Sequence, residues 1–180
     1  GSVCSSIKFV LNNFTNTNTV KITDVVLTSN CDAALVDERA ALNERVRFHV
    51  IPNESINLKE RSVFEDGIKS FWKDTPLPNV VMLLGWNYIL TDNFIDFFRK
   101  NNCLVLNMHP ALPDSFVGAN AVQKTFLQLQ AGKMCETGSM IHVVTPNLDR
   151  GTVLGVSNVQ MNSGYLNSEE ELREVIKMHE

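Results

Sequence analysis

The feature that most constrains the fold is an alternation along the chain between short apolar runs and longer stretches whose apolar residues recur at helical spacing. Strands that alternate with helices are typical of βαβ units, in which helices cover the faces of a mostly parallel sheet. The pattern therefore predicts an α/β fold. The expected strands are Ile22 to Thr28, Val46 to Ile51, Asn79 to Leu84, Cys103 to Met108 and Ser139 to Thr145.

Short-range signals mark where helices begin and end. Thr91 is a suitable N-cap because its hydroxyl can accept a hydrogen bond from the first helical turn, and Gly132 is suited to end a helix. The run Asn79 to Leu84 is typical of a strand buried on both faces, so we expect it at the centre of the sheet. His49 has no partner that the sequence identifies and is interpreted as structural or solvated. The expected helices are Ser5 to Phe14, a segment after Ser29-Asn30, Val63 to Lys73, Asp92 to Lys100, Ala119 to Gly132 and Ser168 onward.

Composition excludes several classes of protein. With 44% hydrophobic and 20% charged residues, the 180-residue chain has the balance of one ordinary globular domain. The formal net charge of −4 provides no basic field for DNA or tRNA. The longest apolar run, Val80 to Leu84, is far shorter than the roughly 20 residues of a membrane span. Four cysteines without a C-x-x-C pair, and no secretory signal in the sequence, favour a reducing compartment, with the cytoplasm as the default.

Asn107 and His109 are the first candidates for chemistry, because they stand at the end of the expected strand Cys103 to Met108. Side chains two residues apart on a strand point the same way, so an amide and an imidazole converge there. Ligands bind beyond the carboxyl ends of the strands in open parallel sheets. Spacing alone leaves open the alternative that both residues cap the strand and satisfy backbone groups of the next loop.

Further motifs follow this pair in a fixed order. They are Asn107-Met108-His109-Pro110, then Gly118, then Gly138-Ser139-Met140-Ile141-His142, and then Leu148-Asp149-Arg150-Gly151. This combination resembles the folate-dependent formyltransferases, most closely the phosphoribosylglycinamide formyltransferases, over about Cys4 to Glu180. The resemblance implies a Rossmann-like three-layer sandwich. It also implies transfer of a formyl group from 10-formyltetrahydrofolate to the amine of glycinamide ribonucleotide in purine biosynthesis.

The resemblance assigns catalysis to Asn107, His109 and Asp149. Formyl transfer passes through a tetrahedral intermediate with a negative oxygen, to which the Asn107 amide and a protonated His109 can donate hydrogen bonds. Asp149 is expected to keep His109 protonated and to hold a water that relays the amine proton to the folate nitrogen. His142 is expected behind these groups in a supporting position, although a single histidine in an apolar strand is more often a core residue.

Two substrate sites follow from the same resemblance. The folate slot is expected to be apolar with a few backbone polar groups, and its residues are Tyr88, Ile89, Leu90, Phe94 and Val144. The phosphate-bearing substrate is expected to contact Cys4, Ser5, Ser6, Arg61, Gly118, Lys177 and Glu180, with helix N-terminal N–H groups holding the phosphate. The chain departs from the family at two places. Cys4-Ser5-Ser6 stands where Gly-Ser-Asn is usual, and Ala119 to Val122 replaces a stretch that contains histidine.

Two other functions remain open at this point. One is a formyltetrahydrofolate hydrolase, in which water replaces the amine, and the other is a catalytically silent folate- or nucleotide-binding domain. No metal, nicotinamide or flavin is expected, because the sequence has neither a ligand cluster nor a G-x-G-x-x-G motif. Residues 1–180 are expected to form a single formyltransferase domain, a monomer or homodimer, that lacks the family's first strand and the end of its last helix.

Overall fold

The computed structural model describes residues 20–28, 46–51, 61–86, 88–161 and 166–178. The expected helices at Ser5 to Phe14 and after Ser29-Asn30 lie outside this part of the chain. The chain divides into two compact units, residues 1–79 with 90–97 and residues 80–89 with 98–180, and each unit is described by itself. No helix among the described residues is both long and apolar enough to cross a membrane.

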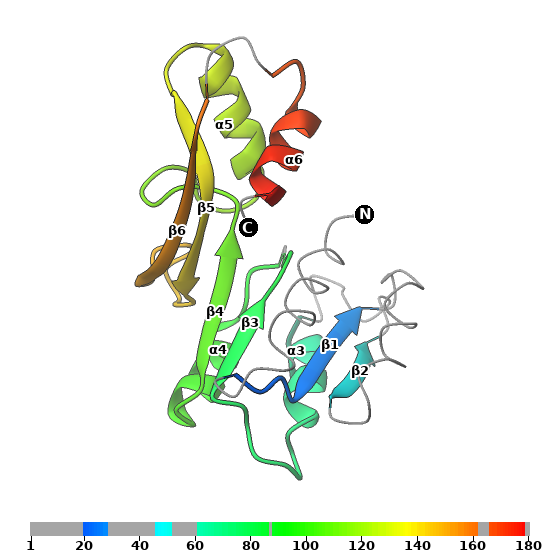
Figure 1. The fold of residues 1–180 in the computed structure, drawn as a ribbon. Coiled ribbons are helices and arrows are strands. Elements are labelled where there is room, and N and C mark those ends of the chain that lie inside the picture. Colours follow the sequence, from blue (N-terminus) through cyan, green and yellow to red (C-terminus); the bar gives the residue numbers. More distant parts are fainter. Residues whose placement is uncertain (1–19, 29–45, 52–60, 87, 162–165, 179–180) are drawn as a thin grey trace. The chain divides into compact units, whose positions relative to one another are not determined.

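Strands and helices alternate along most of the described chain, which confirms the α/β class (Figure 1). The elements are β1 (Asp24–Thr28), β2 (Arg47–Ile51), α3 (Arg61–Ser70), β3 (Val80–Leu83), α4 (Asp92–Lys100), β4 (Leu104–His109), α5 (Ala121–Gln130), β5 (Glu136–Val143), β6 (Val153–Gln160) and α6 (Glu169–Met178).

In the first unit, β1 and β2 are parallel, and Asp24 pairs with Arg47 at the start of their register. The Asp24 carboxylate accepts hydrogen bonds from Arg47 Nε and Nη2, both at 2.8 Å, and lies 2.9 Å from His49 Nε2. His49 also stacks on Phe71. Of the two interpretations, structural or solvated, the structure supports the structural one, with a partner that lies 25 residues earlier in the sequence.

The N-terminus of α4 is held by two acceptors. The Thr91 hydroxyl accepts a hydrogen bond from Phe94 N at 3.2 Å, which confirms Thr91 as the N-cap. The Thr91 N–H in turn donates to the buried carboxylate of Glu65 on α3 at 2.8 Å. A negative charge is favourable at a helix N-terminus, so this contact also ties α4 to α3. The inner face of α4 is buried as its spacing predicts, at Phe94, Ile95 and Phe98.

The second unit contains a mixed sheet in the order β3-β4-β5-β6. The β3–β4 pair is parallel, whereas β4–β5 and β5–β6 are antiparallel. The expectation of a mostly parallel sheet thus holds for the parallel pairs β1–β2 and β3–β4 and fails for the last two strands. The sequence analysis missed β6, whose side chains are largely exposed and whose apolar residues are interrupted by Gly155, Ser157 and Asn158.

The prediction that β3 is buried on both faces at the centre of the sheet is wrong. Val80 and Met82 are exposed, and β4 is the only strand that pairs with β3 among the described residues. A continuous apolar run indicates that a strand can be buried, but it does not show which of its faces another element covers.

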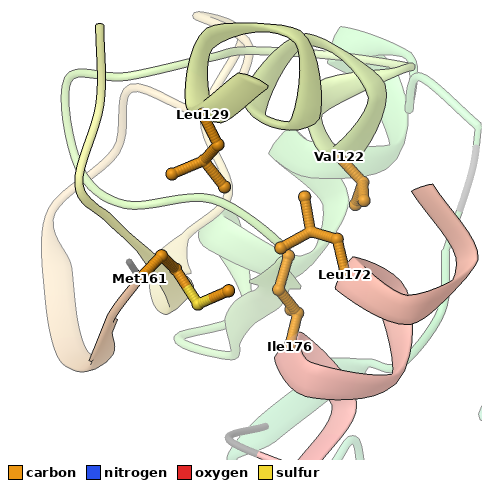
Figure 2. Close-up of a cluster of buried hydrophobic side chains, with 5 residues drawn as sticks. All are labelled: Val122, Leu129, Met161, Leu172 and Ile176. Atoms are coloured by element: carbon orange, nitrogen blue, oxygen red, sulfur yellow. The ribbon is translucent and has the colours of Figure 1, made fainter. Parts of the chain in front are cut away.

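Helices α5 and α6 build the main hydrophobic cluster of the second unit (Figure 2). The sequence predicts the end of α5 correctly, because Gly132 has φ 64° and donates to Leu129 O while Lys133 N donates to Gln128 O. These two hydrogen bonds form a Schellman motif. At the other helix, the Ser168 hydroxyl caps the first turn of α6 by accepting from Glu171 N at 3.2 Å. The buried cluster consists of Val122, Leu129, Met161, Leu172 and Ile176.

The Asp24 cluster predicts a specific loss of stability in acid. Burial alone would raise the pKa of Asp24, but hydrogen bonds from Arg47 and His49 outweigh it and lower the pKa from 3.8 to about 2. A carboxylate whose pKa is depressed in the folded state stabilises the fold above its unfolded pKa, and this contribution is lost as the pH falls toward the folded pKa. The expected loss between about pH 5 and pH 2 is about 2 kcal/mol.

Urea unfolding of the wild type and of Asp24→Asn across this pH range measures the contribution. The unfolding free energy of Asp24→Asn should fall by about 2 kcal/mol less than that of the wild type over this pH range. The matched control is Asp74→Asn, which changes an exposed aspartate of the same unit. Equal pH dependence for Asp24→Asn and the wild type would contradict the assignment.

Candidate active site

The register of two antiparallel strands assembles the polar groups of the candidate site. In the β4–β5 pair, Asn107 lies opposite His142, and His109 lies opposite Met140. Residues directly opposite each other share a face of the sheet, as do residues two apart on one strand. Asn107, His109 and His142 therefore project from the same face. Asp149 belongs to the loop between β5 and β6 and has a left-handed backbone with φ 51°.

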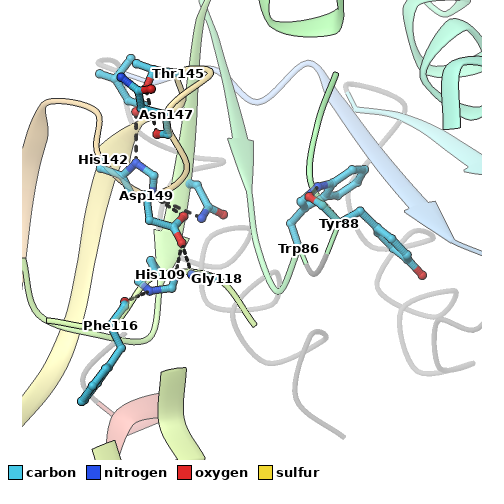
Figure 3. A network of polar contacts seen from close by, with 11 residues as sticks. Trp86, Tyr88, His109, Phe116, Gly118, His142, Thr145, Asn147 and Asp149 are labelled. Carbon is cyan, nitrogen blue, oxygen red and sulfur yellow. Dashed lines mark hydrogen bonds and ion pairs between the residues drawn. The ribbon is translucent and has the colours of Figure 1, made fainter. Parts of the chain in front are cut away.

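The Asp149 carboxylate is the centre of the polar network (Figure 3). One oxygen, Oδ2, lies 3.6 Å from His109 Nδ1, and the other, Oδ1, lies 3.5 Å from His142 Nε2. Gly118 N donates a hydrogen bond of 2.7 Å to Oδ2. All three side chains are almost fully buried, with exposed fractions of 6% for Asp149, 6% for His109 and 2% for His142. The structure thus brings together His109, Asp149, His142 and Gly118.

The pKa shifts describe an ion pair within this network. The hydrogen bond to Asp149 raises the pKa of His142 more than burial lowers it, and the Val143 carbonyl adds to the rise. Burial acts to raise the pKa of Asp149, but the hydrogen bonds from His142 and Gly118 N and the charges of the two histidines together lower it. The carboxylate is therefore held in its ionised form inside the protein.

Asn107 brings an amide to the same place. Its Nδ2 lies 3.4 Å from His142 Nε2, and its buried Oδ1 has no hydrogen-bond partner among the described residues. His142 Nδ1 is 3.1 Å from the Val143 carbonyl, which can only accept, and Nε2 faces Asp149. Because an amide has nearly the same shape when its oxygen and nitrogen exchange places, a rotated Asn107 would accept from His142. That rotation would direct its NH₂ group toward the site now faced by the unpaired oxygen.

Two loops enclose the network and depend on glycine at defined points. Gly118 has φ 72°, and a Cβ there would lie 3.3 Å from Leu148 Cδ2. Gly151 passes so close to Val143 that a Cβ would meet the Val143 carbonyl oxygen at 1.7 Å. Arg150 Nη1 also pairs with Asp114 Oδ1 at 2.9 Å, which links the loop after β5 to the loop after β4. The sequence motif Leu148-Asp149-Arg150-Gly151 includes Gly151, but no sequence signal points to Asp114.

The expected folate residues fall into two groups. Tyr88 and Ile89 are exposed, and Val144 is half-buried with its N–H bonded to Val105 O. Leu90 and Phe94 belong to the other compact unit and are buried in it. The nearby Trp86 donates its indole N–H to the Tyr88 carbonyl at 2.6 Å (Figure 3). The backbone carbonyl expected to meet folate thus already accepts one hydrogen bond.

The expected phosphate-site residues are only partly described. Arg61 is the first residue of α3 in the first unit. Lys177 lies on α6, where its ammonium group pairs with Glu174 on the same helix. Cys4, Ser5, Ser6 and Glu180 lie outside the described residues. Of the three expected contacts that the structure describes, Arg61, Gly118 and Lys177, only Gly118 takes part in the polar network.

Comparisons with known proteins agree with the motifs. Phosphoribosylglycinamide formyltransferase from Schizosaccharomyces pombe is 35% identical over 86 residues, which are 48% of this chain and 42% of that protein. Bovine trifunctional purine biosynthetic protein adenosine-3 is 30% identical over 158 residues, which are 87% of this chain and 14% of that protein. The chain therefore spans less than half the length of these curated relatives.

Solved structures share the fold. The phosphoribosylglycinamide formyltransferase from Brucella melitensis superposes with a TM-score of 0.73 at 22% identity, covering 99% of this chain and 84% of that one. The enzyme of the same name from Anaplasma phagocytophilum gives 0.72 at 20% identity, covering 97% and 75%. These likenesses confirm the Rossmann-like formyltransferase fold. The Formyl transferase family model matches residues 5–180, and on that match the chain belongs to the formyl transferase family.

Proposed function

We propose that this protein transfers the formyl group of 10-formyltetrahydrofolate to the amine of glycinamide ribonucleotide in de novo purine biosynthesis. The observation that carries the proposal is the buried network of His109, Asp149 and His142 beside Asn107. Membership of the formyl transferase family and the names of the curated relatives support the same reaction. The substrates are small molecules, and the enzyme acts in the cytoplasm as a monomer or homodimer.

The reaction begins when the amine lone pair attacks the formyl carbon. A new C–N bond forms, and the carbonyl π electrons move to oxygen. Asn107 and a protonated His109 donate hydrogen bonds to this oxyanion, and one preorganised donor of this kind is worth about 2.7–4 kcal/mol. A lone pair of the oxyanion then re-forms the carbonyl as the bond between the formyl carbon and the folate nitrogen breaks. The electron pair of that bond stays on the folate nitrogen, which takes up the proton lost by the amine.

Asp149 acts through charge and through proton transfer. Its carboxylate is buried and ionised, so it favours positive charge on the adjacent imidazoles. It also holds the water that carries the proton from the amine to the folate nitrogen, a general acid–base role typically worth about 10²–10⁴ in rate. His142 supports Asp149 from the far side, at 3.5 Å from Oδ1.

The substrates occupy different parts of the chain in this proposal. Folate binds along Tyr88, Ile89 and Leu90 through backbone groups, with Phe94 and Val144 as apolar neighbours. The nucleotide substrate binds through its phosphate at the backbone of Cys4-Ser5-Ser6, and its other groups contact Gly118 and the residues Arg61, Lys177 and Glu180. Lys177 pairs with Glu174 in the structure, so it must exchange this partner to reach a substrate.

A formyl-transfer assay with both substrates tests the proposal, and His109→Ala serves as the inactive reference. Transfer by the wild type well above this reference supports it. Loss of the formyl group at the same rate without amine would identify a hydrolase instead. Folate binding with no turnover above His109→Ala would identify a silent binding domain.

Asp149→Asn should lower kcat by at least about 10²-fold because it removes both the charge and the proton acceptor. Asparagine tolerates left-handed backbone better than most residues, so the φ of 51° at this position can be retained and the fold kept. Circular dichroism and thermal unfolding measure whether Asp149→Asn keeps the wild-type fold.

The matched control for this variant is Asp114→Asn. Asp114 is also left-handed, with φ 61°, and also ion-paired, but its side chain is 92% exposed. Its kcat should stay within about twofold of the wild type, because an exposed ion pair contributes little. Equal losses in the two variants, or unchanged turnover in Asp149→Asn, would remove Asp149 from the mechanism.

Trp86→Phe should raise the KM for folate with little change in kcat, because the indole N–H fixes the Tyr88 carbonyl at 2.6 Å. A hydrogen bond with a net value of about 1 kcal/mol corresponds to a rise of about fivefold. Steady-state kinetics with each substrate varied in turn measures the effect. Trp72→Phe is the control, since the Trp72 indole N–H faces Asp24 and Trp72 is not among the proposed substrate contacts. Equal rises in KM for both substrates would contradict a role confined to folate.

A further inference from the structure

The two ring nitrogens of His109 have different surroundings. Nε2 lies 2.8 Å from the main-chain carbonyl of Phe116. Because a carbonyl oxygen can only accept, Nε2 must carry the proton and donate it. The His109 side chain is 6% exposed, so water has little access to compete for this hydrogen bond. One nitrogen of the imidazole thus forms a hydrogen bond with the protein backbone.

The second nitrogen is less firmly engaged. Nδ1 lies 3.6 Å from Asp149 Oδ2, which is beyond ordinary hydrogen-bond distance. That same oxygen already receives the Gly118 N–H at 2.7 Å. Nδ1 therefore lies close enough to the carboxylate to interact with its charge. Among the described residues, no group forms a hydrogen bond of ordinary length with Nδ1.

Both anchors come from one short segment, residues 116–118, which we call the brace. Its carbonyl at Phe116 holds the imidazole, and its N–H at Gly118 holds the carboxylate. Gly118 has a left-handed φ of 72°, and an added Cβ would lie 3.3 Å from Leu148 Cδ2, so this point of the segment has little room for a side chain. A single segment thereby sets the positions of His109 and Asp149 relative to each other.

We propose that the brace positions His109 so that Nδ1, and not Nε2, donates the hydrogen bond to the oxyanion. The inference rests on the proposed formyl transfer and deepens it by naming the reacting atom and the backbone groups that select it. The proton stays on Nδ1 while the oxyanion exists. Phe116 and Gly118 are positioning residues, and they act through their main-chain atoms.

Nitrogen-15 NMR of histidine-labelled protein distinguishes the two nitrogens, and His109→Gln assigns the signals. In the ligand-free protein the neutral imidazole should carry its proton on Nε2, which faces the Phe116 carbonyl. Addition of 10-formylfolate without amine should shift the Nδ1 signal and leave Nε2 nearly unchanged. A neutral form protonated at Nδ1, or a ligand response at Nε2 alone, would overturn the inference.

Gly118→Ala tests the brace itself. A Cβ at φ 72° forces the backbone to move, so the Nε2 signal should shift and kcat should fall about tenfold or more. The KM for folate should stay within about threefold, whereas the KM for the nucleotide substrate should rise, because Gly118 is also a proposed contact of that substrate. Gly155→Ala is the control, because a Cβ there meets nothing within 4 Å. An unchanged Nε2 signal and unchanged kcat in Gly118→Ala would contradict the positioning role.

The outcomes separate this inference from the proposed function. If the wild type transfers formyl groups but its ligand response is at Nε2, only the inference fails. If 10-formylfolate shifts Nδ1 but no transfer occurs, the proposed function fails while the assignment of the nitrogen stands. If 10-formylfolate shifts neither nitrogen signal, the inference fails, and the proposed function fails with it only when the wild type also transfers no formyl group.

Discussion

The structure of the site depends on one buried negative charge. Removing a carboxylate from water costs several kcal/mol unless partners replace its hydration. Asp149 has such partners on both oxygens, with an imidazole near each one and a backbone N–H on Oδ2. Each partner comes from a different element: β4, β5 and the loop that precedes α5. The charge can therefore be buried only when these three parts of the chain are correctly assembled, which links the chemistry of the site to the integrity of the fold.

The first unit also buries a carboxylate, but a different kind of side chain neutralises it. Asp24 is also a buried carboxylate, but it is neutralised by Arg47, whose own side chain is 44% exposed, with further contacts from His49 and Trp72. A guanidinium is always charged, so this cluster loses its ion pair only in acid, when Asp24 itself takes up a proton. Asp149 has imidazoles as partners instead, and its hydrogen bond with His142 raises the pKa of that ring. The choice of partner distinguishes a carboxylate that stabilises the fold from one that can take part in proton transfer.

How much could be predicted from the sequence depended on whether the signal was local. The Thr91 cap, the Gly132 stop and the shared face of Asn107 and His109 follow from neighbouring residues, and the structure contains all three features. The partner of His49 could not be predicted because it depends on the register between two distant strands. The exposed strand β6 lacks the alternation that identifies strands. The role of the Phe116 carbonyl could not be predicted from the sequence, because every residue has a backbone carbonyl.

Two independent requirements restrict which amino acids can replace Asp149, namely a left-handed backbone and a carboxylate. Most side chains are disfavoured at φ 51°, and glycine, which is not, has no carboxylate. Asn102 and Asn120 share the left-handed conformation, with φ 55° and 65°, and neither belongs to the charged network. Asp114 shares it as well, with φ 61°, but pairs with Arg150 beside that network. In a search for more stable variants, glycine can therefore relieve backbone strain at Asn102 and Asn120, whereas at Asp149 the same strain has to be kept for function.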